Sequence, residues 1–168
     1  MILSARTGGF CLSIVILLID FVTKRYVLAN IGQFSAGIPI IDGFVSFTYV
    51  RNAGAAFGMF QGARWPFVVV SMSAVFGLIW ILVRGHATGM RGHAYSLILA
   101  GAMGNLIDRL FYDGRVVDFI LLSWDGHHFP VFNVADMAVS VGACLLILTM
   151  LRPESSAVEA ATDAGLDP

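Results

Sequence analysis

Two aspartates in this sequence stand in apolar surroundings and lack an obvious charged partner. Asp118 interrupts the apolar run VVDFILL, and Asp136 lies near the start of the long apolar stretch 132–151. If the two carboxyl groups meet in a poorly solvated site, both cannot ionise, so the pKa of one must rise. The ionised member of such a pair activates a water molecule, and the protonated member donates to a carbonyl oxygen or a leaving amine, as in aspartic peptidases.

The residue types alone leave other functions open. A proton relay in a small transporter uses the same isolated carboxylates inside a membrane. A non-catalytic membrane scaffold is a third possibility, and it would not need the two carboxyl groups. The sequence DGHH at 125–128 contains possible zinc ligands. Adjacent histidines usually need ligands from elsewhere, however, and the sequence has no HExxH helix, so we expect no metal site.

Further polar residues recur at helical spacing in three apolar segments of the chain. Spacings of three and four residues place side chains on one face of a helix. These residues are Asp20, Thr23 and Lys24 in the first segment, Asn105, Asp108 and Arg109 in the next, and Asn133 and Asp136 in the last. Because each acid in the first two sets has a base within one turn, we interpret Asp20 with Lys24, and Asp108 with Arg109, as structural ion pairs.

The composition indicates that membrane helices position these residues. Of the 168 residues, 58% are hydrophobic and 12% are charged, and the mean hydropathy is +0.83, whereas soluble domains are about 45–50% apolar. Three segments approach the roughly 20 residues that cross a bilayer, and a fourth that begins at Gly8 has twelve apolar residues before Asp20. We predict helices at about 9–28, 65–84, 93–111 and 132–151. We expect the first helix to be retained, because no small-x-small cleavage site follows it.

A small sheet is predicted at about 37–62. The piece FVSFTYV alternates bulky and small polar residues after the turn signal Asp42-Gly43, and NAGAAFG suits a backbone that approaches another group closely. Asp113 and Asp125 have neighbouring glycines and are predicted turn residues. The predicted fold class is an all-α membrane protein with four transmembrane helices and a small β-sheet cradle. One membrane domain covers 1–152, and a disordered tail covers 153–168.

The distribution of basic residues does not by itself fix the orientation of the chain in the membrane. Four crossings place both termini on one side with the loop 84–93, and the predicted sheet on the other side. The side with the termini has four basic residues and the sheet side has six. By the positive-inside rule this count favours a cytoplasmic sheet or decides nothing. The net charge of -1 gives no reason to expect a nucleic-acid partner.

Five stretches together resemble one known family. They are DFVTK at 20–24, RNAGAAFG at 51–58, GAMGNLIDRL at 101–110, GRVVDFI at 114–120 and PVFNVAD at 130–136. In this order, and with four hydrophobic segments, they resemble lipoprotein signal peptidase, also called signal peptidase II. This family of bacterial aspartic peptidases acts in prolipoprotein maturation. The resemblance covers the whole membrane domain and departs from the family pattern only at Ala100 and in the tail from Pro153.

The resemblance implies a site, a substrate and an orientation. Asp118 and Asp136 would be catalytic, and nine residues would line or support the site: Asp20, Lys24, Asn52, Gly54, Gly104, Asn105, Arg109, Asn133 and Ala135. The substrate would be a prolipoprotein with a diacylglyceryl-modified cysteine, cut on the amino side of that cysteine without a metal or organic cofactor. The enzyme would be a monomer in the bacterial cytoplasmic (inner) membrane. Both termini would be cytoplasmic and the active site would lie at the periplasmic or outer face, against the bare charge count.

Overall fold

The computed structural model describes residues 2–54, 62, 64–84 and 89–151 of the chain. The predicted tail at 153–168 and the part of the predicted cradle at 55–61 lie outside these residues.

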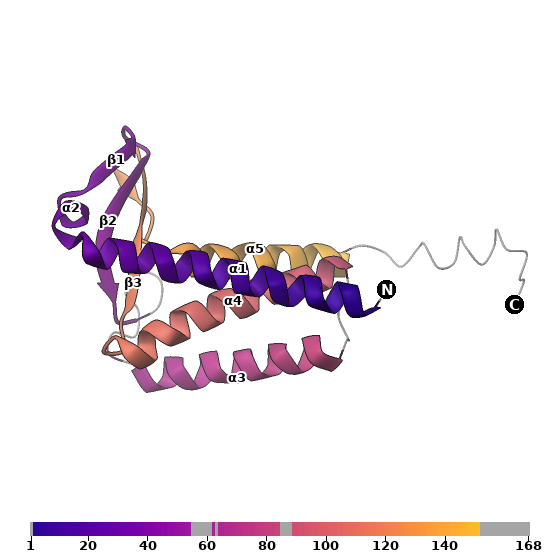
Figure 1. The fold of residues 1–168 in the computed structure, drawn as a ribbon. Helices are drawn as coiled ribbons and strands as arrows, with labels where there is room; N and C mark the ends of the chain where they lie inside the picture. Colours follow the sequence, from indigo (N-terminus) through magenta and orange to yellow (C-terminus); the bar gives the residue numbers. More distant parts are fainter. Residues whose placement is uncertain (1, 55–61, 63, 85–88, 152–168) are drawn as a thin grey trace, which may run out of the picture.

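Four long helices run side by side (Figure 1). They are α1 (Ile2–Ala29), α3 (Arg64–Arg84), α4 (Gly89–Phe111) and α5 (Val134–Leu151). The helix α4 packs against each of the other three. By length and composition, α3 and α5 are apolar enough to cross a membrane, while α1 and α4 carry buried charged side chains. The helices α1 and α4 begin earlier than predicted.

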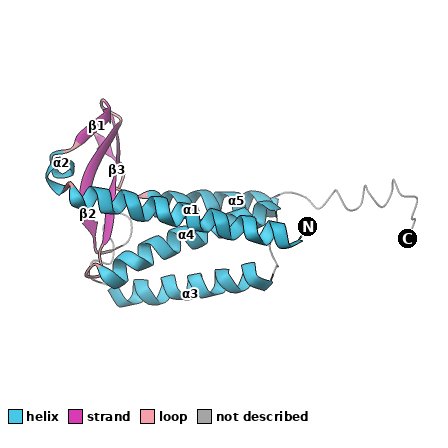
Figure 2. Ribbon diagram, viewed as in Figure 1, coloured by secondary structure: helices cyan, strands magenta, loops and turns pink. Residues whose placement is uncertain are grey.

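A four-stranded antiparallel sheet stands at one end of the helices (Figure 2). Its order is β1 (Ile38–Ile41), β2 (Val45–Asn52), β3 (Val116–Trp124) and β4 (His127–His128), and the short helix α2 (Ile31–Ala36) precedes it. The predicted strand corresponds to β2, and the predicted Asp42-Gly43 turn joins β1 to β2. The fold is therefore mostly helical with a larger sheet than the sequence indicated.

The strand β3 was not predicted because its sequence lacks alternation. Val116, Val117, Asp118 and Phe119 are all buried, so both faces of the strand are covered, and such strands read as continuous apolar runs. The turns on either side of β3 were predicted. Asp113 and Asp125 both adopt positive φ, at 55° and 47°.

The helix α5 begins at Val134, two residues later than predicted, because Asn133 caps it. The side-chain oxygen of Asn133 accepts a hydrogen bond from the Asp136 N–H at 2.9 Å, and Asp136 Oδ2 accepts one from the Asn133 N–H at 3.1 Å. This reciprocal pair is a capping box. The cap fixes the carboxyl group of Asp136 at the first turn of the helix.

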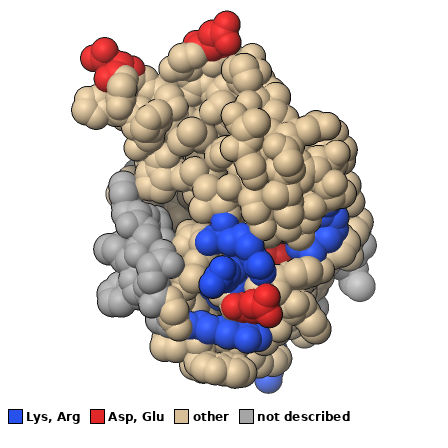
Figure 3. Space-filling view, turned by 90° about the vertical axis from the view of Figure 1, so that its left-hand side faces the viewer, with Lys and Arg blue, Asp and Glu red and all other residues tan. Residues whose placement is uncertain are grey.

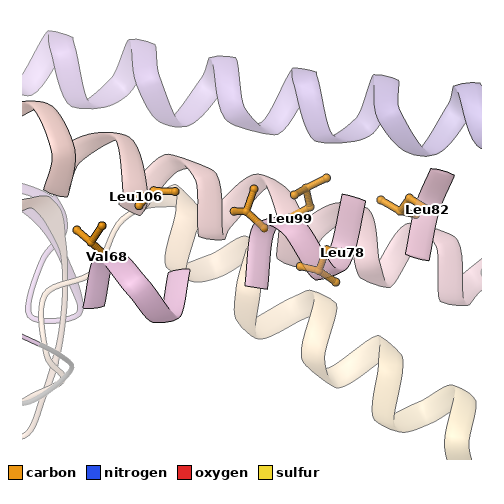
Figure 4. Close-up of a cluster of buried hydrophobic side chains, with 6 residues drawn as sticks. Val68, Leu78, Leu82, Leu99 and Leu106 are labelled. Atoms are coloured by element: carbon orange, nitrogen blue, oxygen red, sulfur yellow. The ribbon is translucent and has the colours of Figure 1, made fainter. Parts of the chain in front are cut away.

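Two kinds of contact hold the helices together. Leucine and valine side chains fill the space between α3 and α4, among them Val68, Leu78 and Leu99 (Figure 4). Between α4 and α5 the backbones come closer. A Cβ atom at Gly101 would overlap the carbonyl of Ala135, which is backbone and has little freedom to move. This close approach brings the polar end of α4 against the start of α5.

Candidate active site

The strand β3 and the start of α5 bring Asp118 and Asp136 to one residue, Asn133. The Asn133 amide donates to Asp118 Oδ1 at 2.7 Å, and the Asn133 backbone N–H donates to Asp136 Oδ2 at 3.1 Å. Each carboxyl group has a second amide donor. Asn52 donates to Asp118 Oδ2 at 3.0 Å, and Asn105 donates to Asp136 Oδ1 at 2.7 Å.

Both carboxyl groups line a cavity of about 780 Å³. The amides of Asn52 and Asn105 and the guanidinium of Arg109 also line it. The remaining walls are largely apolar. They come from α3 (Val70, Ser71, Ala74), α4 (Ile98, Gly101, Ala102), α5 (Met137, Val139, Ser140, Val141) and the segment 129–132. The cavity therefore joins two carboxyl groups to a long apolar surface.

The two carboxyl groups have different surroundings. Asp118 lies in β3, outside the helices, and is only 2% exposed. Burial raises the pKa of Asp118 to about 7 and the charge of Asp136 adds to the rise, although hydrogen bonds from Asn52 and Asn133 oppose it. Asp136 lies in the first turn of α5, at the positive end of the helix dipole. Near neutral pH, Asp118 can therefore hold a proton beside the carboxyl group of Asp136.

A buried lysine supports this arrangement from α1. Lys24 is 1% exposed, and its Nζ lies 2.8 Å from Asp20 Oδ2, 3.1 Å from Asp108 Oδ2 and 3.1 Å from Asn105 Oδ1. The Asn105 oxygen also accepts a hydrogen bond from the Asn133 amide at 3.2 Å. Because Lys24 and Asn133 both donate to this oxygen, they turn the amide nitrogen of Asn105 toward Asp136.

Asp20 also supports the start of α5. Its Oδ1 accepts the Ala135 N–H at 2.9 Å, which satisfies an otherwise unpaired donor at the helix N-terminus. Gly104 is adjacent, and a Cβ atom there would overlap the Asp20 carboxylate. The predicted pairing of Asp20 with Lys24 is confirmed.

The predicted pairing of Asp108 with Arg109 is wrong. Asp108 instead contacts Lys24 and, at 3.1 Å, Arg25, and its Oδ2 accepts the Val117 N–H at 3.2 Å. Neighbouring residues on a helix point in different directions, so Arg109 faces elsewhere. It donates to the Gly54 carbonyl at 3.2 Å and to the Asn105 carbonyl at 3.4 Å.

Asn52 and Gly54 complete the edge of the site. The Asn52 side-chain oxygen accepts the Gly54 N–H at 2.9 Å, which directs the Asn52 amide toward Asp118. All the site residues predicted from the sequence lie in this region. Sequence reasoning missed Arg25 and therefore did not predict its contact with Asp108. The contact between them joins positions 83 residues apart, for which helical spacing gives no signal.

The histidines of the DGHH sequence lie away from the two carboxyl groups. They form β4, and His128 Nδ1 lies 2.9 Å from the Ser123 hydroxyl. Within the described part of the chain, no three His, Cys, Asp or Glu side chains group as metal ligands would.

Comparison with known proteins gives a consistent match. A family model described as Signal peptidase (SPase) II matches residues 12–152. A lipoprotein signal peptidase of Symbiobacterium thermophilum is 44% identical over 144 residues, which cover 85% of this chain and 93% of that protein. One from Pasteurella multocida is 43% identical over 146 residues, which cover 84% and 87%.

Solved structures match the fold as well. A chain described as a bacterial membrane enzyme, solved at 2.3 Å resolution, superposes with a TM-score of 0.78 and 32% sequence identity. The match covers 86% of this chain and 88% of that one.

Proposed function

This chain belongs to the signal peptidase II family of bacterial membrane aspartic peptidases, and on that premise we propose that Asp118 and Asp136 are its catalytic pair. The family removes signal peptides from prolipoproteins. The observation that carries the assignment is the position of Asn133, which contacts both carboxyl groups at the end of the cavity.

The surroundings of the two aspartates suggest a division of roles. Ionised Asp136 accepts a proton from a water molecule as its oxygen attacks the scissile carbonyl carbon, and protonated Asp118 gives its proton to the carbonyl oxygen. The tetrahedral intermediate then breaks its C–N bond, and the amine leaves with the proton taken up by Asp136. One hydroxyl group of the intermediate returns a proton to Asp118 as the new carboxyl group forms. Asn52 and Asn133 hold Asp118 in position, while Asn105 holds Asp136.

We propose a diacylglyceryl-modified prolipoprotein as the substrate, cut on the amino side of the lipidated cysteine. The apolar walls that α3 and α5 contribute to the cavity support a substrate that carries acyl chains. Purified protein in detergent should cleave a lipidated peptide with no ion gradient, and should cleave the same peptide with an unmodified cysteine far more slowly. Equal rates on the two peptides would contradict lipid recognition, and a need for an ion gradient would favour transport.

We propose that α1, α3, α4 and α5 all cross the bacterial inner membrane in a monomer, with both termini cytoplasmic and the sheet at the outer face. Exposed apolar side chains on α1 such as Ile14 and Val22, 56% and 61% exposed, support this arrangement.

Cysteine labelling of intact cells tests the orientation. After replacement of Cys11 and Cys144, both exposed, a membrane-impermeant maleimide should label Asp42→Cys in the turn between β1 and β2. It should label Arg91→Cys near the start of α4 only after the cells are opened. The opposite pattern would place the sheet in the cytoplasm.

The pH dependence of cleavage follows from the proton on Asp118. Burial raises the pKa of Asp118 to about 7, so the proposed acid is protonated below that pH and loses its proton above it. We therefore expect kcat/KM to fall above about pH 7, approaching tenfold per pH unit. A pH profile with the purified enzyme and a lipopeptide measures this. A rate that stays level to pH 9 would show that Asp118 does not supply the proton.

A further inference from the structure

Four arginines gather at the sheet end of α4, and none of them lines the cavity that holds the two aspartates. They come from α1 (Arg25), the end of β2 (Arg51), the start of α3 (Arg64) and the segment before β3 (Arg115). Figure 3 shows Lys and Arg side chains collected on this end of the molecule beside acidic ones. We call these four residues the arginine cluster.

Three members of the cluster are tied to the residues that end α4. Arg51 Nη2 contacts the Tyr112 carbonyl at 3.0 Å, and Arg64 Nη2 contacts the Leu110 carbonyl at 3.0 Å. The guanidinium carbon of Arg25 lies 3.8 Å from the centre of the Tyr112 ring. These contacts satisfy carbonyl groups at the helix C-terminus. They use only part of each guanidinium, which has five N–H donors.

The cluster carries an excess of positive charge. Its acidic contacts are Asp113, whose side chain is 86% exposed and 3.5 Å from Arg51, and Asp108, which Lys24 shares with Arg25. The backbone N–H of Arg115 donates to the Tyr112 carbonyl at 3.1 Å. Its side chain is exposed and forms no hydrogen bond or ion pair with the residues that the structure describes. Guanidinium groups gathered on one surface repel one another, and an anion placed among them reduces that repulsion.

The surface next to the arginine cluster indicates which kind of anion the cluster binds. Trp65 and Phe111 are 66% and 73% exposed and stand at the ends of α3 and α4 that face the sheet. Exposed aromatic rings at helix ends are typical of the level of lipid headgroups. Guanidinium groups bind phosphate through paired N–H donors. We propose that the arginine cluster binds the phosphate of an anionic phospholipid headgroup in the outer leaflet, at a site separate from the catalytic cavity.

Native mass spectrometry of the full-length protein in neutral detergent tests this proposal. Titration with phosphatidylglycerol should give saturable binding that is tighter than binding of phosphatidylcholine. Arg115→Gln should weaken phosphatidylglycerol binding about fivefold, the effect of one basic residue near an anionic surface. Arg84→Gln is the matched control, since Arg84 lies at the far end of α3 beside Trp80, and should leave the affinity unchanged.

Three results would overturn the proposal. They are equal binding of the two lipids, an equal loss in the Arg84 and Arg115 variants, and displacement of the lipid by inorganic phosphate at matched concentration. The last result would identify a site for free phosphate. Cleavage of a lipopeptide in lipid-free detergent should be normal in Arg115→Gln, because Arg115 does not line the cavity. Failure of the headgroup proposal would thus leave the assignment of the peptidase site intact.

Discussion

Replacing either Asp118 or Asp136 with asparagine should lower kcat by at least about 10²- to 10⁴-fold, the usual contribution of a general acid or base. Asparagine keeps the size of each side chain and can accept one of its hydrogen bonds, but it neither takes a proton from water nor donates one to a carbonyl oxygen. Single-turnover cleavage of a lipidated peptide by purified protein measures the effect. Asp125→Asn, a change in an exposed turn at positive φ, should retain the activity of the unchanged protein.

The same substitution at Asp118 should change how stability depends on pH. The pKa of Asp118 is about 7 in the folded protein and 3.8 ordinarily, so between these values the folded state holds a proton that the unfolded state has lost. Stability therefore falls as pH rises from about 4 to 7, by on the order of 4 kcal/mol. Asp118→Asn should remove this fall in a series of melting curves. Loss of activity with an unchanged pH dependence of melting would contradict the buried, protonated state assigned to Asp118.

The sequence could predict those parts of the site that rest on contacts within one element. Asp20 and Lys24 are one helical turn apart and do pair, and the lack of a base near Asp136 did mark it as different. Contacts between elements could not be predicted. The side chain of Asp108 turns away from Arg109 toward α1, and β3 gave no alternating pattern because both of its faces are buried.

The contacts of the basic side chains explain why the count of basic residues on each side is a poor guide to the orientation of the chain in the membrane. Lys24 and Arg109 belong to the network around the two aspartates, and Arg51 and Arg64 bind carbonyl groups at the end of α4. Basic residues held by such contacts are fixed by the fold, whereas the positive-inside rule concerns residues free in loops. Removing these four from the count leaves Arg25 and Arg115 on the sheet side, and Arg25 is itself paired with Asp108.

Replacing Lys24 with methionine should destabilise the protein strongly. Lys24 is 1% exposed and contacts two buried carboxylates, Asp20 and Asp108. Methionine fills similar space but leaves Asp20 without its cation, while Asp108 keeps Arg25. Breaking a buried ion pair from one side costs about 3–5 kcal/mol. Thermal melting of the purified variant in detergent should show this loss as a lower melting temperature. A melting temperature equal to that of the wild type would contradict a structural role for the ion pair.

A second variant separates the structural effect of Lys24 from its effect on the site. Asp20→Asn combined with Lys24→Met removes both charges of the pair, so much of the lost stability should return. Activity should return only in part, because the Asn105 oxygen keeps the Asn133 amide as a donor but lacks Lys24, and both of them turn the Asn105 amide nitrogen toward Asp136. Recovery of both stability and full activity in the double variant would mean that Lys24 serves the fold alone.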